Sequence, residues 1–303
     1  MQVRDWLSLL GMPLMLLSVQ VIAVILVLPM QAAGLAAFED PESVANPLIF
    51  IGMLLVFTLI LLLLIRFGGR RFIALFIGFA IFMTFLYIFS ALSLLVLGAT
   101  DAAAISTLIA AAAATALLYL YPEWYVIDVL GVLISAGVAS IFGVSLAILP
   151  VLVLLVLLAI YDAISVYRTK HMITLAEGVL ETKAPIMVVV PKRADYSFRR
   201  EGLNISDGEE RGAFVMGMGD LIMPTILVAS SHVFVDAPAV LWTLSAPTLG
   251  AMAGSLAGLA VLLRFVNRGN PQAGLPPLNG GAILGFLVGA VLAGSFGWCP
   301  FCI

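Results

Sequence analysis

Apolar stretches of about 20 residues, almost free of charge, recur along most of the chain, and a helix of that length crosses a bilayer. Nine of them are expected to span, near residues 6–30, 47–65, 72–98, 102–121, 124–142, 144–167, 213–235, 238–263 and 279–298. The run 124–167 is too long for one span and is divided at residues 140–143. The pattern predicts an all-α polytopic membrane protein with nine transmembrane helices, in which residues 1–303 form one membrane domain.

Composition and charge give the protein a membrane location and an orientation. Of the 303 residues, 63% are hydrophobic and only 10% are charged, whereas soluble domains carry about 25% charged residues. If the nine spans alternate, all 14 Lys and Arg residues fall in loops on one side, and acids such as Glu39, Asp101 and Asp236 fall on the other. The positive-inside rule then places the N-terminus in the cytoplasm and the C-terminus outside, in the cell membrane. A net charge of -3 and the lack of a basic, aromatic sequence patch exclude a nucleic-acid partner.

Two aspartates interrupt the apolar pattern, Asp162 in the sixth expected span and Asp220 in the seventh. A carboxylate at the centre of a transmembrane helix costs about 2.5–3.5 kcal/mol, so such residues are rare and mark functional sites. Asp162 lies six residues before Arg168, and Asp220 lies nine residues after Arg211. At about 1.5 Å per residue, two antiparallel helices bring both carboxyl groups to one level, roughly 9–14 Å inside the cytoplasmic boundary. A third acid, Asp128, is expected near the water interface.

Two carboxyl groups within hydrogen-bonding distance suit acid–base chemistry, because both cannot ionise cheaply and one keeps its proton. The ionised group takes a proton from water while the protonated group donates to a carbonyl oxygen, which gives metal-free peptide hydrolysis with an activity maximum in pH. No metal or other cofactor is expected, since His171 lies in a loop and His232 near the outer end of the seventh span. Cys299 and Cys302, at the C-terminal end, are interpreted as an incidental or structural pair, not a catalytic one. A channel or proton-coupled transporter that uses the paired aspartates remains an alternative.

Short motifs around the aspartates resemble those of a known family, the intramembrane aspartyl proteases that include presenilin and signal peptide peptidase. The three elements that carry the resemblance read Tyr161-Asp162, Gly217-Met218-Gly219-Asp220 and Leu275-Pro276-Pro277-Leu278. The first two match the family's Y-D and G-x-G-D in residue and in span number, whereas Pro277 stands where the family's P-A-L element has alanine. The chain looks most like the compact microbial, archaeal-type members, and the likeness in topology extends over its whole length.

The resemblance implies a presenilin-like fold and an aspartic endopeptidase that cleaves the transmembrane helices of membrane proteins without a cofactor. It also implies that Asp162 and Asp220 are the catalytic dyad, and that the supporting residues are Tyr161, Gly217, Gly219, Pro276, Pro277 and Leu278. A cytoplasmic N-terminus matches presenilin, so the implied substrates are helices whose N-terminus lies outside. Prepilin-type peptidases also use G-x-G-D with two aspartates, but they cleave at the membrane surface. An inverted repeat of broken helices, which would favour a transporter, is not visible in the sequence.

The one long loop, 168–212, contains a β-branched run between Pro185 and Pro191 that predicts a strand without an obvious partner. Unwinding a helical substrate exposes backbone N–H and C=O groups, which are costly at membrane depth unless they are hydrogen-bonded. An unpaired strand edge satisfies such groups. Substrate binding by strand pairing is therefore a hypothesis for the segment Ile186, Met187, Val188, Val189 and Val190.

Overall fold

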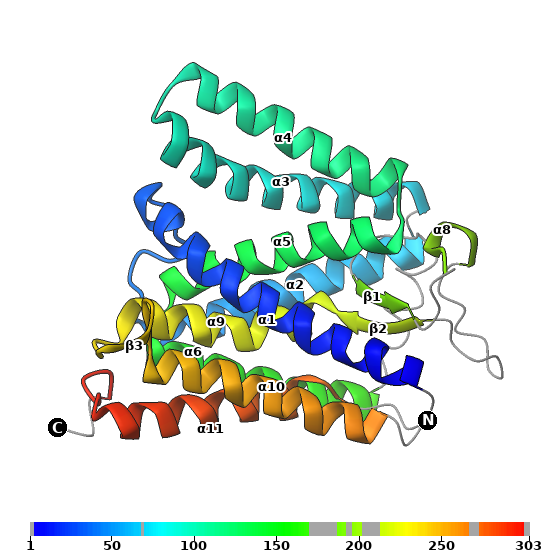
Figure 1. Cartoon of the computed structure of the whole chain (residues 1–303). Helices are drawn as coiled ribbons and strands as arrows, with labels where there is room; N and C mark the ends of the chain where they lie inside the picture. The colour runs from blue at the N-terminus through cyan, green and yellow to red at the C-terminus, as the bar shows by residue number, and fades with distance from the viewer. Residues whose placement is uncertain are drawn as a thin grey trace.

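Long helices lie side by side in the computed structural model, which describes residues 3–67, 70–169, 187–191, 196–201, 213–266 and 273–299 (Figure 1). Within these residues the long helices are α1 (Val3–Ala32), α2 (Ala45–Phe67), α3 (Arg70–Leu97), α4 (Asp101–Leu120), α5 (Trp124–Ser145), α6 (Ile148–Ile164), α9 (Met218–Phe234), α10 (Ala246–Val266) and α11 (Leu275–Ala293). Eight of them are long and apolar enough to cross a membrane, and α9 is a shorter apolar helix of 17 residues. The prediction of an all-α polytopic membrane protein is confirmed.

Shorter elements lie between the helices. A π-helical turn, η1 (Ser165–Thr169), extends α6, and a four-residue helix, α8 (Phe198–Glu201), follows the first strand. The strands pair antiparallel, β1 (Met187–Pro191) with β2 (Ala213–Gly217) and β3 (Ala239–Leu241) with β4 (Leu244–Ser245). The strand expected in the long loop is therefore present as β1. The expectation that it has no partner is wrong, because β2 runs beside it.

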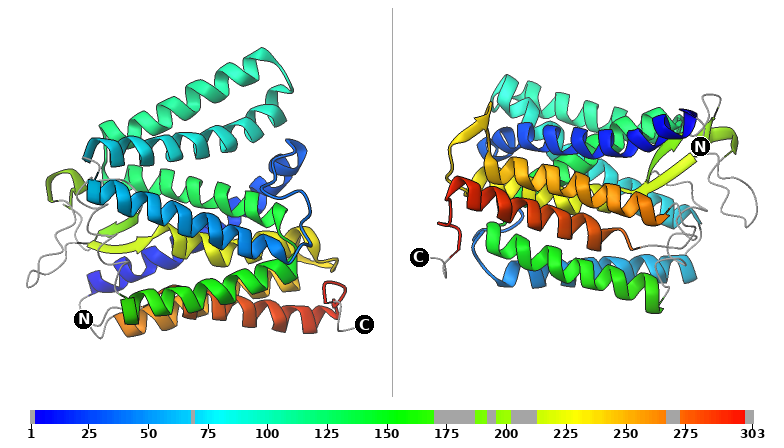
Figure 2. Two further views of the ribbon diagram at one scale, coloured as in Figure 1. Left: turned by 180° about the vertical axis from the view of Figure 1, so that it is seen from behind. Right: turned by 60° about the horizontal axis from the view of Figure 1, so that its bottom comes forward.

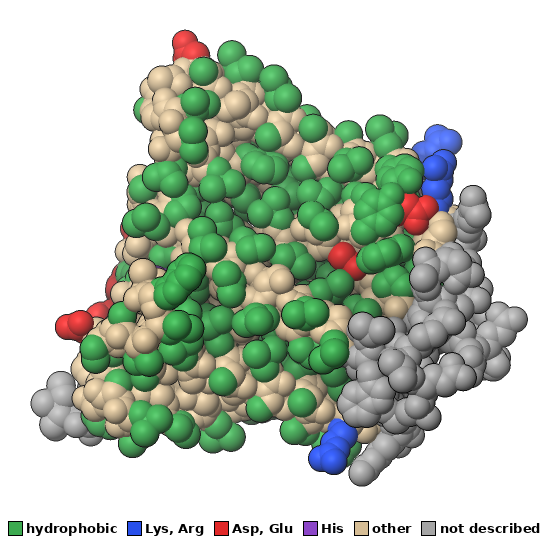
Figure 3. Space-filling model, viewed as in Figure 1, with side chains coloured by type: hydrophobic (Ala, Val, Ile, Leu, Met, Phe, Trp, Pro, Cys, Tyr) green, Lys and Arg blue, Asp and Glu red, His purple; other side chains and the backbone are tan. Residues whose placement is uncertain are grey.

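The helices form a bundle with α9 near its centre (Figures 1 and 2). α3 and α4 pack on each other at one edge, and α10 and α11 pack on each other at the opposite edge, with α6 beside α11. Between these groups α9 contacts α1, α5, α6, α10 and α11, which explains why most of its residues are buried. The outer surface is largely apolar, as a lipid-facing surface requires (Figure 3).

The break between the fifth and sixth spans falls at Leu146 and Ala147, later than the predicted 140–143. Two residues that suggested a turn are accommodated inside α5. Ser140 donates its hydroxyl to a carbonyl one helical turn earlier, so its polar group is satisfied within the helix. Gly143 leaves room for Ala229 of α9, where an added methyl group would collide. The small and polar stretch therefore serves helix packing, not chain reversal.

Three other boundaries also differ from the sequence prediction. Residues 213–217, expected in the seventh span, form β2, and residues 239–245, expected in the eighth, form the β3–β4 hairpin. Trp242 in that hairpin has a φ of 56°, the left-handed region. α11 begins at Leu275, earlier than the predicted 279. Pro276 and Pro277 fit its first turn because the backbone N–H groups there have no partner within the helix.

Small residues bring α10 and α11 into direct backbone contact. A methyl group added at Gly254 would collide with the carbonyl oxygen of Gly281, and one added at Gly281 would collide with that of Gly254. Glycines repeat the same relation along the two helices, at Gly250, Gly258, Gly285 and Gly289. In lipid, where apolar contact alone gives no drive to associate, such close approach stabilises a helix pair through van der Waals contact. The stripe fixes α11, including its first turn, against α10.

We expect Gly254→Ala to lower the melting temperature of the purified protein, since overpacking costs about 1–3 kcal/mol. Gly280→Ala in α11 is the matched control, because nothing lies within 4 Å of an added methyl group there. Alanine is also the better helix former, so the control should be neutral or stabilising. Thermal unfolding in one detergent measures both, and equal melting temperatures for the two variants would contradict the packing role of the glycine stripe.

Candidate active site

Asp162 lies in the last turn of α6 and is buried, with 7% of its surface exposed. Its Oδ2 accepts the backbone N–H of Leu275 at 3.0 Å. This donor belongs to the first residue of α11, where helix N–H groups have no partner within the helix and the helix dipole favours negative charge. The first turn of α11 therefore binds the Asp162 carboxylate.

Asp220 lies in the first turn of α9, and its carboxyl group lies against Gly274. A methyl group added at Gly274 would lie 2.8 Å from Oδ2 and 3.0 Å from Oδ1 of Asp220. Asp162 and Asp220 are close enough for their charges to interact. The structure thus brings together the two aspartates that the sequence places at one depth, and they meet at Gly274.

The glycines of the G-x-G-D element surround the start of α9. Gly217 ends β2 and directly precedes the helix, with a φ of -65°. Gly219 is exposed, and nothing lies within 4 Å of a methyl group built there. Neither glycine has a positive φ, so neither is required for an unusual backbone conformation. Gly219 instead leaves open space immediately beside Asp220.

Tyr161 and two residues that the sequence analysis did not single out lie near Asp162. Tyr161 directly precedes it in α6 and is half-buried. Tyr167 of η1 accepts the backbone N–H of Ala273 at 3.5 Å with its hydroxyl oxygen. This contact ties the end of the α6 segment to the residue before Gly274. Sequence motifs alone give no signal for it, since the two residues are 106 positions apart.

The Leu-Pro-Pro-Leu element forms the first turn of α11 and holds that turn in place. Pro276 and Pro277 are half-buried, and Leu278 is fully buried in the apolar core. The next residue, Asn279, donates its side-chain N–H to the Leu155 carbonyl of α6 at 3.0 Å. The sequence analysis missed Asn279, although a buried amide in an apolar span is a signal that it has a partner.

The predicted substrate-binding segment lies in β1, apart from Ile186, which is outside the described residues. Met187 is half-buried, and Val188, Val189 and Val190 are all buried. One edge of β1 pairs with β2, and on the other edge the Val189 N–H donates to Asp128 Oδ1 at 2.7 Å. Asp128, expected near the water interface, is only 6% exposed and is therefore buried within the protein.

Within the described part of the chain, no three His, Cys, Asp or Glu side chains are grouped closely enough to hold a metal ion. His232 lies in the last turn of α9, at the opposite end of that helix from Asp220. Cys299 is disulfide-bonded, and Cys302 lies outside the described residues.

Comparisons with known proteins agree on one family. The family model described as signal-peptide peptidase, presenilin aspartyl protease matches residues 12–295. One similar solved structure is a presenilin family intramembrane aspartate protease in space group C222, with 71% identity, a TM-score of 0.72, and coverage of 94% of this chain and 99% of that one. A second, in space group P2, has 70% identity, a TM-score of 0.72, and coverage of 95% and 100%. No curated protein matches the chain.

These matches span nearly the whole chain, and they support a protease over the channel or transporter that the sequence left open. The eight apolar helices agree with the membrane location of that family. The chain belongs to the signal-peptide peptidase and presenilin aspartyl protease family, and it is an integral, multi-pass intramembrane aspartyl protease.

Proposed function

We propose that Asp162 and Asp220 are the catalytic dyad, and that it hydrolyses peptide bonds in transmembrane helices of membrane proteins. The observation that carries the proposal is the meeting of both carboxyl groups at the start of α11, where Asp220 lies against Gly274 and Asp162 accepts the Leu275 N–H. Asp162 is buried and Asp220 is half-buried, and the open space beside Gly219 leaves room for a substrate backbone next to these two reacting groups.

The hydrogen bond to Asp162 supports a division of roles between the two acids. Backbone N–H donors bind an ionised carboxylate better than a neutral acid, so Asp162 is the base and Asp220 carries the shared proton. Asp162 takes a proton from water as the water oxygen bonds to the substrate carbonyl carbon, and Asp220 gives its proton to the carbonyl oxygen. Asp162 then returns its proton to the amide nitrogen, the C–N bond breaks, and the proton of the collapsing diol returns to Asp220.

A substrate helix must be unwound at the cut, and β2 offers a strand edge beside the dyad. The Val189 N–H points to Asp128, so in the antiparallel alternation Val189 and Val215 form a pair without mutual hydrogen bonds. The backbone groups of Val215 and Gly217 then face the outer edge of β2. We place substrate pairing on this edge, with β1 behind it, in place of the direct pairing with β1 that the sequence suggested.

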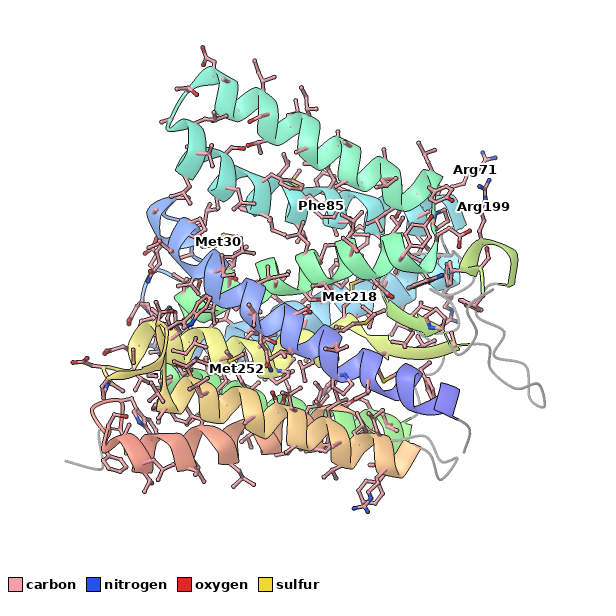
Figure 4. The ribbon with its side chains drawn as sticks, in the orientation of Figure 1. Met30, Arg71, Phe85, Arg199, Met218 and Met252 are labelled. Carbon is pink, nitrogen blue, oxygen red and sulfur yellow. The ribbon has the colours of Figure 1, made fainter. Side chains whose placement is uncertain are left out.

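The active site faces the cytoplasm in the orientation that we propose, with the protein in the cell membrane. The support is the distribution of basic residues. Arg71 and Arg199 lie at the end of the bundle where α1 begins, and the β1–β2 pair lies toward the same end (Figures 1 and 4). Basic residues are retained on the cytoplasmic side of a membrane protein.

Asp162→Asn and Asp220→Asn should each abolish cleavage of a single-span peptide in liposomes, because each removes a titratable group while keeping the shape. Asp236→Asn, at an exposed residue beyond the end of α9, is the control and should cleave normally. Mass spectrometry of the products measures all three. Turnover by either purified dyad variant would refute the assignment of the dyad.

Gly274→Ala should reduce turnover at least ten-fold while the protein stays folded, since the new methyl group would press on the Asp220 carboxyl group. Gly280→Ala, six residues further along, adds the same methyl group in open space and should leave turnover unchanged. Turnover is compared at matched amounts of folded protein, judged by thermal unfolding. Full activity of Gly274→Ala would show that the contact at Gly274 does not matter to the dyad.

Val215→Pro should lower turnover of a membrane-embedded substrate, because proline removes an N–H from the outer edge of β2 and leaves the ladder with β1 intact. Val215→Thr keeps the N–H and the branched shape, so its effect should be mild. Steady-state cleavage of one liposome-embedded peptide measures both variants. If proline at this position leaves turnover unaltered, substrate does not pair with this edge.

A further inference from the structure

Asp128 is a buried carboxylate that the proposed chemistry does not use. It lies in the second turn of α5, and its Oδ1 accepts the Val189 N–H at 2.7 Å. Its Oδ2 is buried without a hydrogen-bond partner among the described residues. Just before α5, Glu123 accepts the Ser197 hydroxyl at 2.9 Å, so this end of the helix holds the chain on both sides of residues 192–195. Burying a carboxylate with one oxygen unpaired costs free energy of folding. We therefore ask what the hydrogen bond to Val189 contributes to function.

Around this hydrogen bond, α5 and α1 form a packing surface for β1, with Gly131 and Gly11 at its centre. One turn beyond Asp128, a methyl group added at Gly131 would lie 3.5 Å from Val188 Cγ1 and 2.7 Å from Met218 Cε. From α1, a methyl group added at Gly11 would lie 2.7 Å from Val190 Cγ1. Glycines on two helices thus make room for the strand and for the start of α9, where Met218 lies (Figure 4). This packing surface holds the side chains of β1, and Asp128 holds its free edge through the Val189 N–H.

The position of β1 passes to the active site through its register with β2. Val189 lies opposite Val215, and Met187 lies opposite Gly217, the last residue of β2. α9 begins directly after Gly217 and carries Asp220 in its first turn. The hydrogen bonds between β1 and β2 keep the two strands in one register. A shift of β1 along α5 would therefore shift β2, and with it the start of α9, relative to Asp162 on α6.

We propose that Asp128 is a positioning residue that sets which peptide bond of the substrate reaches the dyad. Its carboxylate anchors β1 at one height on α5, β1 holds β2, and β2 presents the substrate strand to Asp162 and Asp220. The inference rests on the proposed function, including the pairing of substrate with the outer edge of β2. Asp128 itself touches no reacting atom, so its loss changes the choice of bond as well as the rate.

Three variants separate this role from simple stabilisation. Asp128→Asn keeps an acceptor for the Val189 N–H in the same shape, whereas Asp128→Leu keeps the size and removes the acceptor. Val189→Pro removes the donor and leaves the ladder with β2, because the Val189 N–H points away from β2. Each is assayed in liposomes with a synthetic single-span peptide that the parent protein cleaves. The readouts are kcat, KM, the melting temperature and the proportion of cuts at each bond, read by mass spectrometry.

Asp128→Asn should cut at the parent positions with kcat/KM within about twofold. Asp128→Leu and Val189→Pro should each lose about tenfold in kcat/KM, the upper end of the usual net worth of one hydrogen bond. Both should spread the cuts over neighbouring bonds. The double variant should be no worse than either single variant, because both changes remove one bond.

The proposal is overturned if Asp128→Leu and Val189→Pro cut the same bonds in the parent proportions, whatever their rates. It is also overturned if Asp128→Asn spreads the cuts as widely as Asp128→Leu. Should Asp128→Leu fail to fold, Val189→Pro against Asp128→Asn decides by the same criterion. Failure of the dyad assignment looks different, since it would appear as cleavage by Asp162→Asn or Asp220→Asn in a chain with Asp128 unchanged.

Discussion

The hydrogen bond from the Leu275 N–H to the Asp162 carboxylate is the interaction on which the arrangement of the active site depends. Inside a membrane protein a carboxylate lacks bulk water, so fixed dipoles of the chain must replace it. The start of α11 supplies such a dipole through the Leu275 N–H. Pro276 and Pro277 follow, and neither has an N–H that would need a partner of its own. With two prolines in this turn, the free backbone donor is the Leu275 N–H, which lies next to Asp162.

Because that bond comes from a helix end, the site depends on how firmly α11 is held. The glycine stripe sets α11 against α10 at backbone contact, and Asn279 ties it to α6 through the Leu155 carbonyl. The two contacts join α11 to two different helices, α10 and α6. Together they restrain the position of α11 along its axis as well as its distance from its neighbours. An error of about 1 Å in placing reacting groups costs orders of magnitude in rate, which gives this packing a catalytic consequence.

The small β1–β2 sheet is the one place where the helical plan is interrupted near the dyad in the described part of the chain. A strand edge buried in such a protein must have its backbone groups satisfied. On one side of β1 the partner is β2, and on the other it is Asp128. The chain then passes through Gly217 directly into the helix that carries Asp220. The strand and the helix of Asp220 are thus one continuous segment.

The sequence alone determined the helical class, the approximate spans and the two aspartates, because these depend on local composition and on the fixed rise of a helix. It also predicted β1, a local run of β-branched residues. Only the tertiary structure decided that β2 is its partner, that Asp128 is buried, and that Gly274 lies against Asp220. The physical reason is separation along the chain. The Asp128–Val189 bond joins residues 61 positions apart, and the bond from Leu275 to Asp162 joins residues 113 apart, so no local pattern encodes either one.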